Sequence, residues 1–498
     1  MADKNSKNIK NRPPVVVVLG HVDHGKSSIL EAIKDFKITS KESGGITQHI
    51  GAYQIEHEGK KITFIDTPGH EAFSAMRSRG AKIADIALLV IAAEEGLKPQ
   101  TKEAIKHIKE AKLPMIVVLN KIDKPQADPE RVKRELVNQD VIVESLGGTV
   151  PSINTSASTG KGIPELLEMI LLVAEMEDLK EPLSESACGS VIEAYKDAKR
   201  GPVAVVIMHS GILNEGVIIG TASTTGKVKT MEDFQGNRIK QAFPSMPVII
   251  LGFEDVPDTG EEVRVFSEAE GAKKGMKPVG NANSSLIKPT GEETGKIVNL
   301  IIKTDVLGSL EAINNVLKSI PREKVGINVL KAGVGEINDS DVKLAKTSGS
   351  LILGFRVKAT PIAQKLALRE KVRIMAFDII YELAQSVRET LERKLSPQTL
   401  KKDLGRIKIL AFFKKEGRRQ VIGGKVLNGE VKRGAMIEVS RNEEKIGKGR
   451  IIRLQREKEE VDSVGKGREC GILFEGDVQA QENDIFQAYA EEKQKDTL

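Results

Sequence analysis

The chain has 498 residues with a formal net charge of +6, and it is too long for one hydrophobic core, so we expect about three or four domains. It has no long uncharged apolar stretch and no signal-peptide pattern at its start, which predicts a cytoplasmic protein without a membrane partner. Its two cysteines, Cys188 and Cys470, form neither a disulfide framework nor a metal cluster, in keeping with a reducing compartment. The modest positive charge allows a nucleic-acid partner without demonstrating one.

A flexible basic arm is predicted at residues 1–12, followed by a first domain over residues 13–181. Apolar runs alternate there with helical patterns, which predicts a mostly parallel sheet covered by helices, with ligands at the carboxyl ends of the strands. The first run, 15–19, leads into the glycine-framed loop GHVDHGKS and then into helical spacing. This is the pattern of a P-loop, in which backbone amides surround a polyphosphate, Lys26 reaches its outer phosphates and Ser27 can ligate Mg²⁺. The predicted phosphate-binding residues are Gly20, His21, Val22, Asp23, His24, Gly25, Lys26, Ser27 and Ser28.

Two further segments carry groups that suit the γ-phosphate and its metal ion. The string DTPGH at residues 66–70 ends a predicted strand, which places Asp66 to hold Mg²⁺ through water and the amide of Gly69 to meet the γ-phosphate. The glycine-rich segment 44–51 offers the hydroxyl of Thr47 as a second Mg²⁺ ligand. The predicted ligands of the second phosphate segment are Asp66, Thr67, Pro68, Gly69 and His70.

The base is predicted to be guanine. Asp123 closes the strand 115–119, and its carboxylate can accept two hydrogen bonds from the ring N–H and the exocyclic amine of guanine. Adenine lacks this pair of donors, and an unpaired buried carboxylate penalises the wrong base. After another strand, a backbone amide at residues 156–157 can meet the guanine carbonyl oxygen. The predicted base-binding residues are Asn120, Lys121, Ile122, Asp123, Ser156 and Ala157.

The remainder of the chain is predicted to alternate between β-rich and α/β modules. A hairpin-like sequence pattern at residues 211–216 recurs at 429–434, which indicates two related barrels. The predicted fold class is therefore multidomain α/β and β, with a P-loop domain, two β-barrels, a central α/β/α domain and a connecting helix. The predicted boundaries are 182–275 for the first barrel, 276–293 for a linker, 294–376 for the α/β/α domain, 377–397 for the connecting helix and 398–498 for the second barrel.

The motifs of the first domain resemble those of the translational GTPases, and the string GGITQHIGAY at residues 44–53 is similar to that of bacterial translation initiation factor 2. The resemblance implies that His70 is the catalytic residue that orients the attacking water, with Val22 and Ile46 as an apolar gate beside it. Ser158 departs from the family, which usually has lysine there. The family commonly carries a long segment ahead of the GTPase domain, whereas only residues 1–14 precede Val15 here, so we expect a short form.

The same resemblance implies the function and the partners. The expected protein is a ribosome-activated GTPase that uses GTP and Mg²⁺, binds formylmethionyl initiator tRNA, places it on the small ribosomal subunit and promotes joining of the large subunit. GTP hydrolysis would drive its release. The resemblance also allows other initiation factors as partners and a monomeric state away from the ribosome.

The last module is where the resemblance places the initiator tRNA. Its basic residues interleave with glutamates, so charge alone fits a solvated surface as well as a binding patch. The string GRECGI at residues 467–472 is interpreted as a turn, and it is similar to the family signature that cradles the formylmethionyl end. Gly424 stands where the family usually has a second cysteine, so either the pocket is formed mainly by backbone, which we favour, or recognition is poor. The implied contacts are Arg456, Lys458, Glu469, Cys470 and Gly471.

Two alternatives stay open at this point. The first is another translational GTPase, such as an elongation or specialised tRNA-delivery factor, which the strings at 44–53 and 467–472 disfavour. The second is a GTP-dependent binding scaffold with negligible hydrolysis. The sequence does not separate this scaffold from a GTPase, because stimulated turnover depends on geometry that the partner supplies.

Overall fold

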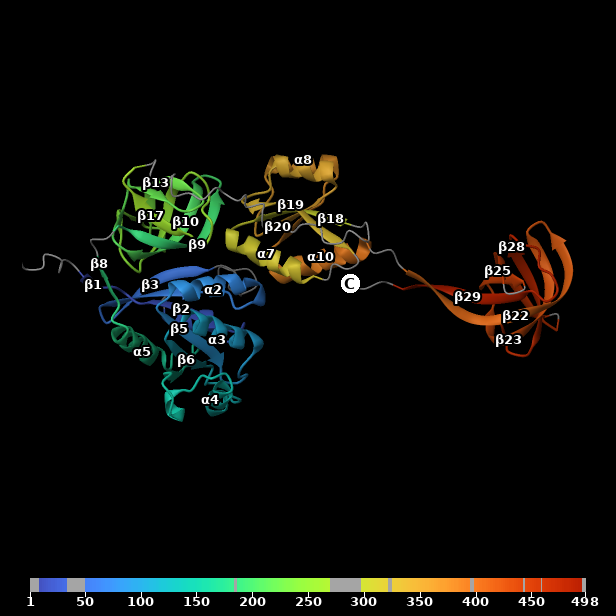
Figure 1. Cartoon of the computed structure of the whole chain (residues 1–498), viewed down its shortest axis with the longest axis horizontal. Coiled ribbons are helices and arrows are strands. Elements are labelled where there is room, and N and C mark those ends of the chain that lie inside the picture. The colour runs from blue at the N-terminus through green and yellow to red at the C-terminus, as the bar shows by residue number, and fades with distance from the viewer. Residues whose placement is uncertain are drawn as a thin grey trace, which may run out of the picture. The chain divides into compact units, whose positions relative to one another are not determined.

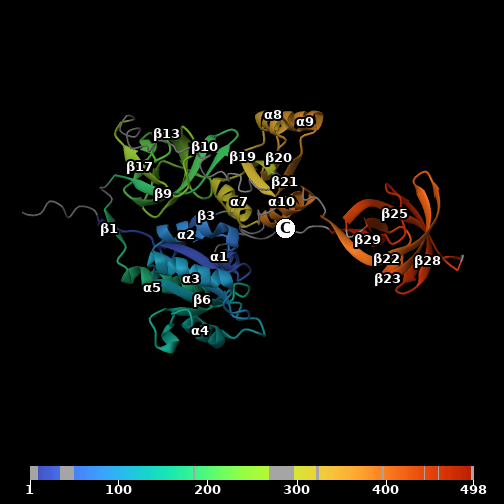
Figure 2. The ribbon, with the colours of Figure 1, turned by 45° about the vertical axis from the view of Figure 1, so that its right-hand side comes forward.

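The computed structural model of the chain describes residues 9–33, 50–182, 186–268, 297–320, 325–394, 398–441, 444–457 and 459–494. By its internal packing the chain separates into two compact units, Met1–Thr390 and Leu391–Leu498, and each is described by itself. The first unit contains a helix-covered sheet, a barrel and a second helix-covered sheet (Figures 1 and 2). Within the described ranges, no helix has the length and apolar character needed to cross a membrane.

The first sheet has six strands in the order β3-β4-β2-β5-β6-β7, all parallel to their neighbours except the antiparallel pair β3 and β4. Strands β2 and β5 are buried along their whole length, which is why their sequences are continuous apolar runs. The predicted ligand turns follow β2, β4 and β6, so they meet at one edge of the sheet. The strands are β2 (Val15–Gly20), β3 (Gly51–His57), β4 (Lys60–Asp66), β5 (Ile86–Ala92), β6 (Met115–Asn120) and β7 (Ser152–Asn154).

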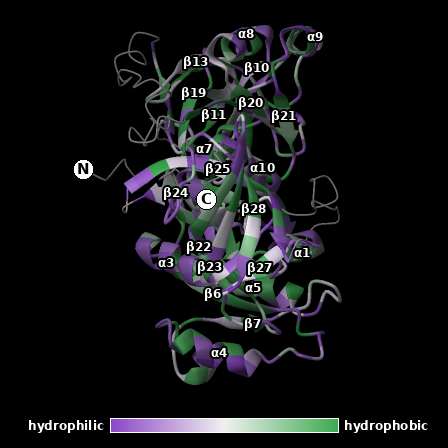
Figure 3. Cartoon of the chain, turned by 90° about the vertical axis from the view of Figure 1, so that its right-hand side faces the viewer, coloured by the Kyte–Doolittle hydropathy of each residue, from purple (hydrophilic) through white to green (hydrophobic). Residues whose placement is uncertain are grey.

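Helices cover this sheet with their apolar sides. Helices α1 and α5 share one hydrophobic core with the strands, and α2 and α3 contact each other and β2. Helix α4 is amphipathic, with Val132 and Leu136 buried, and Figure 3 colours it in both hydrophobic and hydrophilic shades. The helices are α1 (Lys26–Ile33), α2 (Ser74–Ile83), α3 (Pro99–Ala111), α4 (Pro129–Val137) and α5 (Ile163–Met176), with short 3-10 helices η3 (Glu71–Phe73) and η4 (Glu144–Leu146).

The end of the predicted arm at residues 1–12 differs from the expectation of a flexible segment. Strand β1 (Ile9–Asn11) pairs antiparallel with β8 (Lys180–Pro182), and the guanidinium of Arg12 donates to both carboxylate oxygens of Asp85 at 2.6 and 2.7 Å. These partners lie far away in the sequence, so local composition gives no sign of them. Residues 1–8 lie outside the described residues.

The second sheet of the first unit is a barrel. Its order is β12-β17-β9-β10-β16-β13-β14, and a further pairing of β12 with β13 closes the ring, which confirms the predicted barrel. Its core is built from alternate, inward-facing apolar residues of each strand. The strands of this sheet are β9 (Cys188–Asp197), β10 (Gly201–Ser210), β12 (Ile218–Gly220), β13 (Thr225–Glu232), β14 (Arg238–Ile239), β16 (Pro247–Phe253) and β17 (Glu262–Phe266). Two short strands, β11 (Leu213–Asn214) and β15 (Gln241–Ala242), pair with each other in a separate sheet.

The third sheet has four parallel strands in the order β19-β18-β20-β21. Helices α8 and α9 share its core, and Figures 1 and 2 show α7 and α10 on the opposite side from α8, which confirms the predicted α/β/α class. The linker predicted at 276–293 lies outside the described residues. The elements are β18 (Ile297–Thr304), α7 (Leu307–Ser319), β19 (Gly326–Val334), α8 (Asp339–Ser348), β20 (Leu351–Phe355), α9 (Pro361–Glu370), β21 (Ile374–Phe377) and α10 (Ile380–Lys394).

The second unit is another barrel. Its path β22-β29-β24-β25-β28-β23 is closed by pairing of β22 with β23, as the sequence predicted, and its interior is apolar and includes Cys470. The strands are β22 (Gln398–Glu416), β23 (Arg419–Lys432), β24 (Met436–Arg441), β25 (Glu444–Arg456), β26 (Glu459–Glu460), β27 (Ser463–Gly465), β28 (Glu469–Gly476) and β29 (Ile485–Gln494).

Candidate functional site

The loop between β2 and α1 is shaped by two glycines. Gly20 has φ of +148°, and a Cβ there would lie 2.3 Å from the carbonyl oxygen of Val90. Gly25 has φ of +87°, and a Cβ there would lie 2.3 Å from Nδ2 of Asn120. Any other residue would be strained at both positions and would collide with a neighbour. The loop therefore turns tightly at the start of α1 and has no side chain at either glycine, as a phosphate-binding loop requires.

Lys26 is a buried cation that is held by backbone carbonyls. Its ammonium is close to the main chain of the loop, donating to the carbonyls of Gly20 at 3.1 Å and His21 at 2.6 Å. Burial lowers the pKa of Lys26 to about 8, although Asp66 opposes this shift. Gly69 lies against the same ammonium, since a Cβ there would come within 2.5 Å of Nζ. A phosphate would supply the anion that this desolvated cation favours.

The residues that could hold Mg²⁺ lie beside the loop. Ser27 Oγ donates to Asp66 Oδ2 at 3.5 Å, and Asp66 is only 2% exposed. A hydroxyl and a carboxylate in this arrangement are the oxygen ligands that Mg²⁺ uses together with nucleotide phosphates, so the donor set fits the ion. The third predicted ligand, Thr47, lies outside the described residues, as does Ile46 of the predicted apolar gate.

Asn120 joins the phosphate loop to the base loops. Its side chain is 1% exposed, its Nδ2 donates to the carbonyl of His24 at 3.0 Å, and its Oδ1 accepts from the amide of Ala157 at 3.2 Å. The hydroxyl of Thr155 also donates to Oδ1, at 3.3 Å. The side-chain amide of Asn120 therefore fixes the phosphate loop, the segment 120–123 and the segment 155–157 relative to one another.

Asp123 presents an exposed carboxylate whose orientation is fixed by serines. The hydroxyl of Ser156 donates to Asp123 Oδ1 at 2.6 Å, and this hydrogen bond lowers the pKa of Asp123. The Ser158 hydroxyl lies 3.0 Å from that of Ser156, so the position that departs from the family pattern braces the residue that holds Asp123. Lys121 has a left-handed backbone, with φ of +63°, and its ammonium pairs with Glu94 at 2.8 Å. The arrangement holds an ionised acceptor in place for a base with two adjacent donors.

His70 follows Gly69 and is neutral at pH 7. Burial, and then the charge of Arg77, lowers its pKa to about 4. Its Nδ1 accepts a hydrogen bond from the amide of Ala72 at 2.9 Å, so in the neutral ring the proton is on Nε2. Among the described residues, no side chain or backbone group is bonded to this buried Nε2. His70 thus carries a hydrogen-bond donor that is available to a further partner.

Arg77 is a site residue that the sequence analysis missed. It is fully buried in α2, and its Nη1 donates to the carbonyls of Pro68 at 3.0 Å and His70 at 2.5 Å. Its Nη2 donates to both carboxylate oxygens of Glu103 in α3, at 2.8 and 2.7 Å. The backbone on either side of Gly69 is therefore fixed by one guanidinium. The only sign in the sequence is that Arg77 falls on the buried stripe of α2, four residues after the buried Phe73.

Other predicted ligands have structural roles in this arrangement. The hydroxyl of Thr67 is buried and donates to the carbonyl of Val18 at 2.8 Å, which ties the segment to β2. The amide of Val22 donates to Oε1 of Gln100 at 3.2 Å, and Asp23 has a left-handed backbone with φ of +62°. His24 is fully buried, and desolvation lowers its pKa to about 3, so it is a neutral core histidine.

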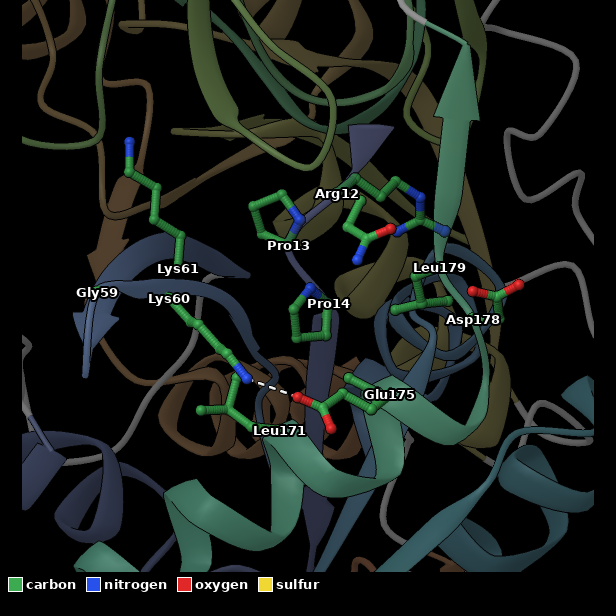
Figure 4. Close-up of a pocket in the computed structure, with 12 residues that line it drawn as sticks. Arg12, Pro13, Pro14, Gly59, Lys60, Lys61, Leu171, Glu175, Asp178 and Leu179 are labelled. Carbon is green, nitrogen blue, oxygen red and sulfur yellow. Dashed lines mark hydrogen bonds and ion pairs between the residues drawn. The ribbon is translucent and has the colours of Figure 1, made fainter. Parts of the chain in front are cut away.

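A cavity of about 430 Å³ lies at the opposite end of β2 from the phosphate loop. Figure 4 shows Pro13 and Pro14 at its wall, together with the ion pair between Lys60 and Glu175, whose atoms are 2.5 Å apart. None of the predicted nucleotide ligands lines this cavity. It is therefore separate from the candidate nucleotide site.

The described tRNA contacts lie in β25 and β28 of the second unit, and Gly424 lies in β23, which also pairs with β28. The strand register pairs Gly424 with Cys470, and Gln455 with Gly471. Cys470 is 5% exposed, its thiol donates to the carbonyl of Gly424 at 3.6 Å, and burial raises its pKa to about 11. A Cβ on Gly424 would lie 2.7 Å from Cγ2 of Ile407. Both positions therefore face the barrel core, where a side chain is not available to a ligand.

Two other predicted contacts, Glu469 and Arg456, have side chains that reach solvent. Glu469 is exposed and lies opposite Lys425, and Arg456 is half-buried and donates to Glu457 at 3.2 Å. The segment 469–471, which the sequence analysis placed in a turn, forms the start of β28 instead, because its backbone pairs with β23. Lys458 lies outside the described residues.

Comparison with known proteins gives the family. Family models match at residues 11–176 (elongation factor Tu GTP binding domain), 186–266 (elongation factor G domain 2) and 273–388 (translation-initiation factor 2). The chain is 44% identical to translation initiation factor IF-2 of Caldanaerobacter subterraneus, covering 98% of this chain and 71% of that protein. The chain belongs to the IF-2 family.

Two further relatives agree with this assignment. IF-2 of Carboxydothermus hydrogenoformans is 43% identical over 99% of this chain, and that of Rubrobacter xylanophilus is 40% identical over 98%. This chain spans 61% of the length of the first and 72% of the second. A crystal structure of GDP-bound aIF5B from Aeropyrum pernix matches with a TM-score of 0.48 and 26% identity, over 96% of this chain and 92% of that one. Within the IF-2 family, the first domain of this chain is thus a GTP-binding domain.

Proposed function

We propose that this chain is a ribosome-activated GTPase that acts in translation initiation in the cytoplasm. The observation that carries the nucleotide part is Asn120, whose amide bonds the phosphate loop at His24 and the base loop at Ala157. Because these segments belong to different strand ends, one buried side chain fixes the distance between a phosphate cradle and a base pocket. This rigid spacing suits a nucleotide that spans both.

Guanine recognition is assigned to Asp123. Its carboxylate, which is oriented by Ser156, accepts from the two adjacent donors of guanine. The amide of Ala157, which bonds Asn120 Oδ1 at 3.2 Å, would share its hydrogen with the base's carbonyl oxygen. Lys26 turns its ammonium from the loop carbonyls toward the phosphates. Ser27, and Asp66 through water, would hold Mg²⁺, which would supply positive charge against the phosphates.

His70 is assigned the orientation of the attacking water. A neutral imidazole whose Nδ1 is already engaged by Ala72 offers its Nε2–H as a donor, so in this state it positions water rather than removing a proton. His70 lines an open groove of about 990 Å³ that is not lined by Lys26, Ser27 or Asp66. Its ring must therefore turn toward the phosphates for hydrolysis, and we assign that step to the ribosome.

The second barrel is assigned to formylmethionyl initiator tRNA. Arg456 and Lys458 supply cations for the phosphates, while strand residues Glu469 and Gly471 supply contacts near the terminal ester. Since positions 424 and 470 face the core, the formylmethionyl group would meet backbone and outward-facing residues. The proposed partners are the small and large ribosomal subunits, with subunit joining as the outcome of binding.

The test is protection of the tRNA ester by the full chain. Spontaneous hydrolysis of formylmethionyl initiator tRNA is timed with added protein, beside the same tRNA without the formyl group. We expect selective protection of the formylated form, because the free amine carries a charge that is costly to bury. Arg456→Gln should weaken protection, whereas Cys470→Ala, a core change, should keep selectivity in the folded protein.

Other outcomes would exclude the assignment. Equal protection of both tRNAs would favour a tRNA-delivery factor of the elongation type. Absence of protection at protein concentrations that saturate ribosome binding would mean that this barrel does not hold the aminoacyl end.

A further inference from the structure

Tyr381 touches His70 from a different part of the fold. It is the second residue of α10, and its ring centroid lies 4.1 Å from that of His70, with the two planes inclined by 63°. Phe73 is a second aromatic neighbour of the imidazole, with its centroid at 6.0 Å and the planes inclined by 80°. The imidazole of His70 thus has two aromatic neighbours in edge-on arrangements, which favour one ring orientation. Tyr381 itself is 55% exposed, so the core of the fold does not require it.

The contact with Tyr381 keeps the imidazole of His70 in the open groove rather than near the proposed position of the GTP phosphates. The groove that His70 lines also contains Tyr381, Gln100 and Arg388, whereas Lys26 and the metal-binding oxygens are outside it. The backbone carbonyl of His70 is held by Arg77, so a change of ring position must come from rotation of the side chain. Such a rotation separates the imidazole from the ring of Tyr381.

Helix α7, which belongs to the same domain as α10, is bonded to α2, the helix that follows His70. Helices α7 and α10 lie on the same side of the third sheet (Figure 1). The carboxylate of Glu311 in α7 accepts from Nη2 of Arg79 in α2 at 3.0 and 2.8 Å. The hydroxyl of Thr259 in the first barrel donates to the same carboxylate at 2.8 Å. At the start of α7, the amide of Gly308 donates to Glu193 of the barrel at 3.2 Å. These bonds tie α7 to α2 and to the barrel, whereas Tyr381 belongs to α10, so a shift of α10 relative to α2 would change the distance between Tyr381 and His70.

We infer that Tyr381 is a positioning residue that holds the imidazole of His70 in a resting orientation until α10 moves relative to the segment 68–73. This inference rests on the proposed role of His70. The tyrosine lowers the population of the orientation that reaches the attacking water, so it restrains hydrolysis in the absence of the ribosome. Its ring contact is with His70, to which we assign hydrolysis rather than nucleotide binding, so GTP affinity does not depend on Tyr381.

The first experiment measures the contact itself. The full chain is labelled with ¹³C at histidine, and the ring signals of His70 are assigned by their loss in His70→Gln. In Tyr381→Ala the ring signals of His70 should shift, because the neighbouring ring current is removed. In Tyr381→Phe, which keeps the ring, they should stay near the parent positions. Gln385→Ala, at another lining residue of the same groove, should also leave them unchanged.

The second experiment measures the consequence. Single-turnover GTP hydrolysis without ribosomes should be about three- to tenfold faster in Tyr381→Ala than in the parent, as expected for loss of one aromatic pair. GTP affinity and the ribosome-stimulated rate should be unchanged, and Tyr381→Phe should behave as the parent. Adding His70→Ala to Tyr381→Ala should abolish the gain, because the gain acts through His70.

The two measurements separate the possible failures. If the His70 signals do not move in Tyr381→Ala, or if they move but the ribosome-free rate stays within twofold of the parent, the inference is wrong. If the gain persists in the double variant, Tyr381 does not act through His70, and the inference is also wrong. Failure of the proposed role of His70 is recognised independently, by normal ribosome-stimulated hydrolysis in His70→Ala with the tyrosine intact.

Discussion

Replacing Arg77 by methionine removes the hydrogen bonds that fix the segment around Gly69. Arg77 is fully buried and donates to two carbonyls and to both oxygens of Glu103. Methionine has a similar length but no donors, so the carbonyls of Pro68 and His70 and a carboxylate that is only 25% exposed each lose a partner. Removing one partner of a buried ion pair costs about 3–5 kcal/mol. Because Glu103 keeps some solvent and a contact with His107 at 3.3 Å, we expect about 3 kcal/mol.

Hydrogen exchange in the full chain measures this loss where it occurs. The chain has several domains, so a single unfolding midpoint does not describe it, whereas exchange reports local opening of α2 and α3. A loss of about 3 kcal/mol corresponds to roughly a hundredfold faster exchange of the protected amides in these helices. Arg134→Met, on the exposed side of α4, is the matched control. It should change the free energy of local opening by under about 0.5 kcal/mol.

A double variant tests whether the cost comes from the ion pair. Glu103→Gln removes the carboxylate charge, so Arg77→Met together with Glu103→Gln should cost at least about 1 kcal/mol less than the sum of the single changes. Less than about fivefold faster exchange in Arg77→Met, or strict additivity in the double variant, would refute the reasoning.

Two further predictions concern the base and pH. In Asp123→Asn, one of the two acceptors becomes a donor, so GTP affinity should fall and affinity for xanthosine triphosphate should rise. Both nucleotides are titrated against the variant, and unchanged GTP binding would contradict the assignment of guanine recognition to Asp123. Burial raises the pKa of Glu103, but hydrogen bonds from His107, Ser74 and Arg77 lower it more, to about 2 from 4.5. Its stabilisation is therefore full above pH 4.5 and lost as pH falls toward 2, amounting to about 2–3 kcal/mol. On acidification, the loss of hydrogen-exchange protection in α3 should be smaller by this amount in Glu103→Gln than in the parent. An equal loss in both proteins would argue against a stabilising role of the Glu103 charge.

The elements that the sequence predicted correctly are those with strong local patterns. The run 15–19 is continuous and apolar because β2 is buried on both faces, and the glycines after it permit conformations that other residues avoid. The alternation of short β-rich runs with glycine turns likewise predicted both closed barrels. These features follow from neighbours in sequence, so they are visible without the fold.

The features that were missed depend on distant partners or on register. Arg77 is buried because Glu103 and two carbonyls meet it in space, and an arginine on an apolar stripe does not reveal this by itself. The inward direction of Gly424 depends on irregularities in the pairing of β22 with β23, one of them between Ile409 and Ala411. Each such irregularity shifts which residues face the core, so period-two alternation cannot assign them.

The most direct test of the central claim is GTP hydrolysis by the full chain with and without assembled ribosomes, measured in parallel for His70→Ala. The parent should be stimulated by the ribosome about a hundredfold or more, and His70→Ala should bind GTP normally but lose most of that stimulation. Absence of stimulation in the parent would contradict a ribosome-activated GTPase and favour a GTP-dependent scaffold. Stimulated turnover in His70→Ala within a few-fold of the parent would assign the water-orienting role to another residue.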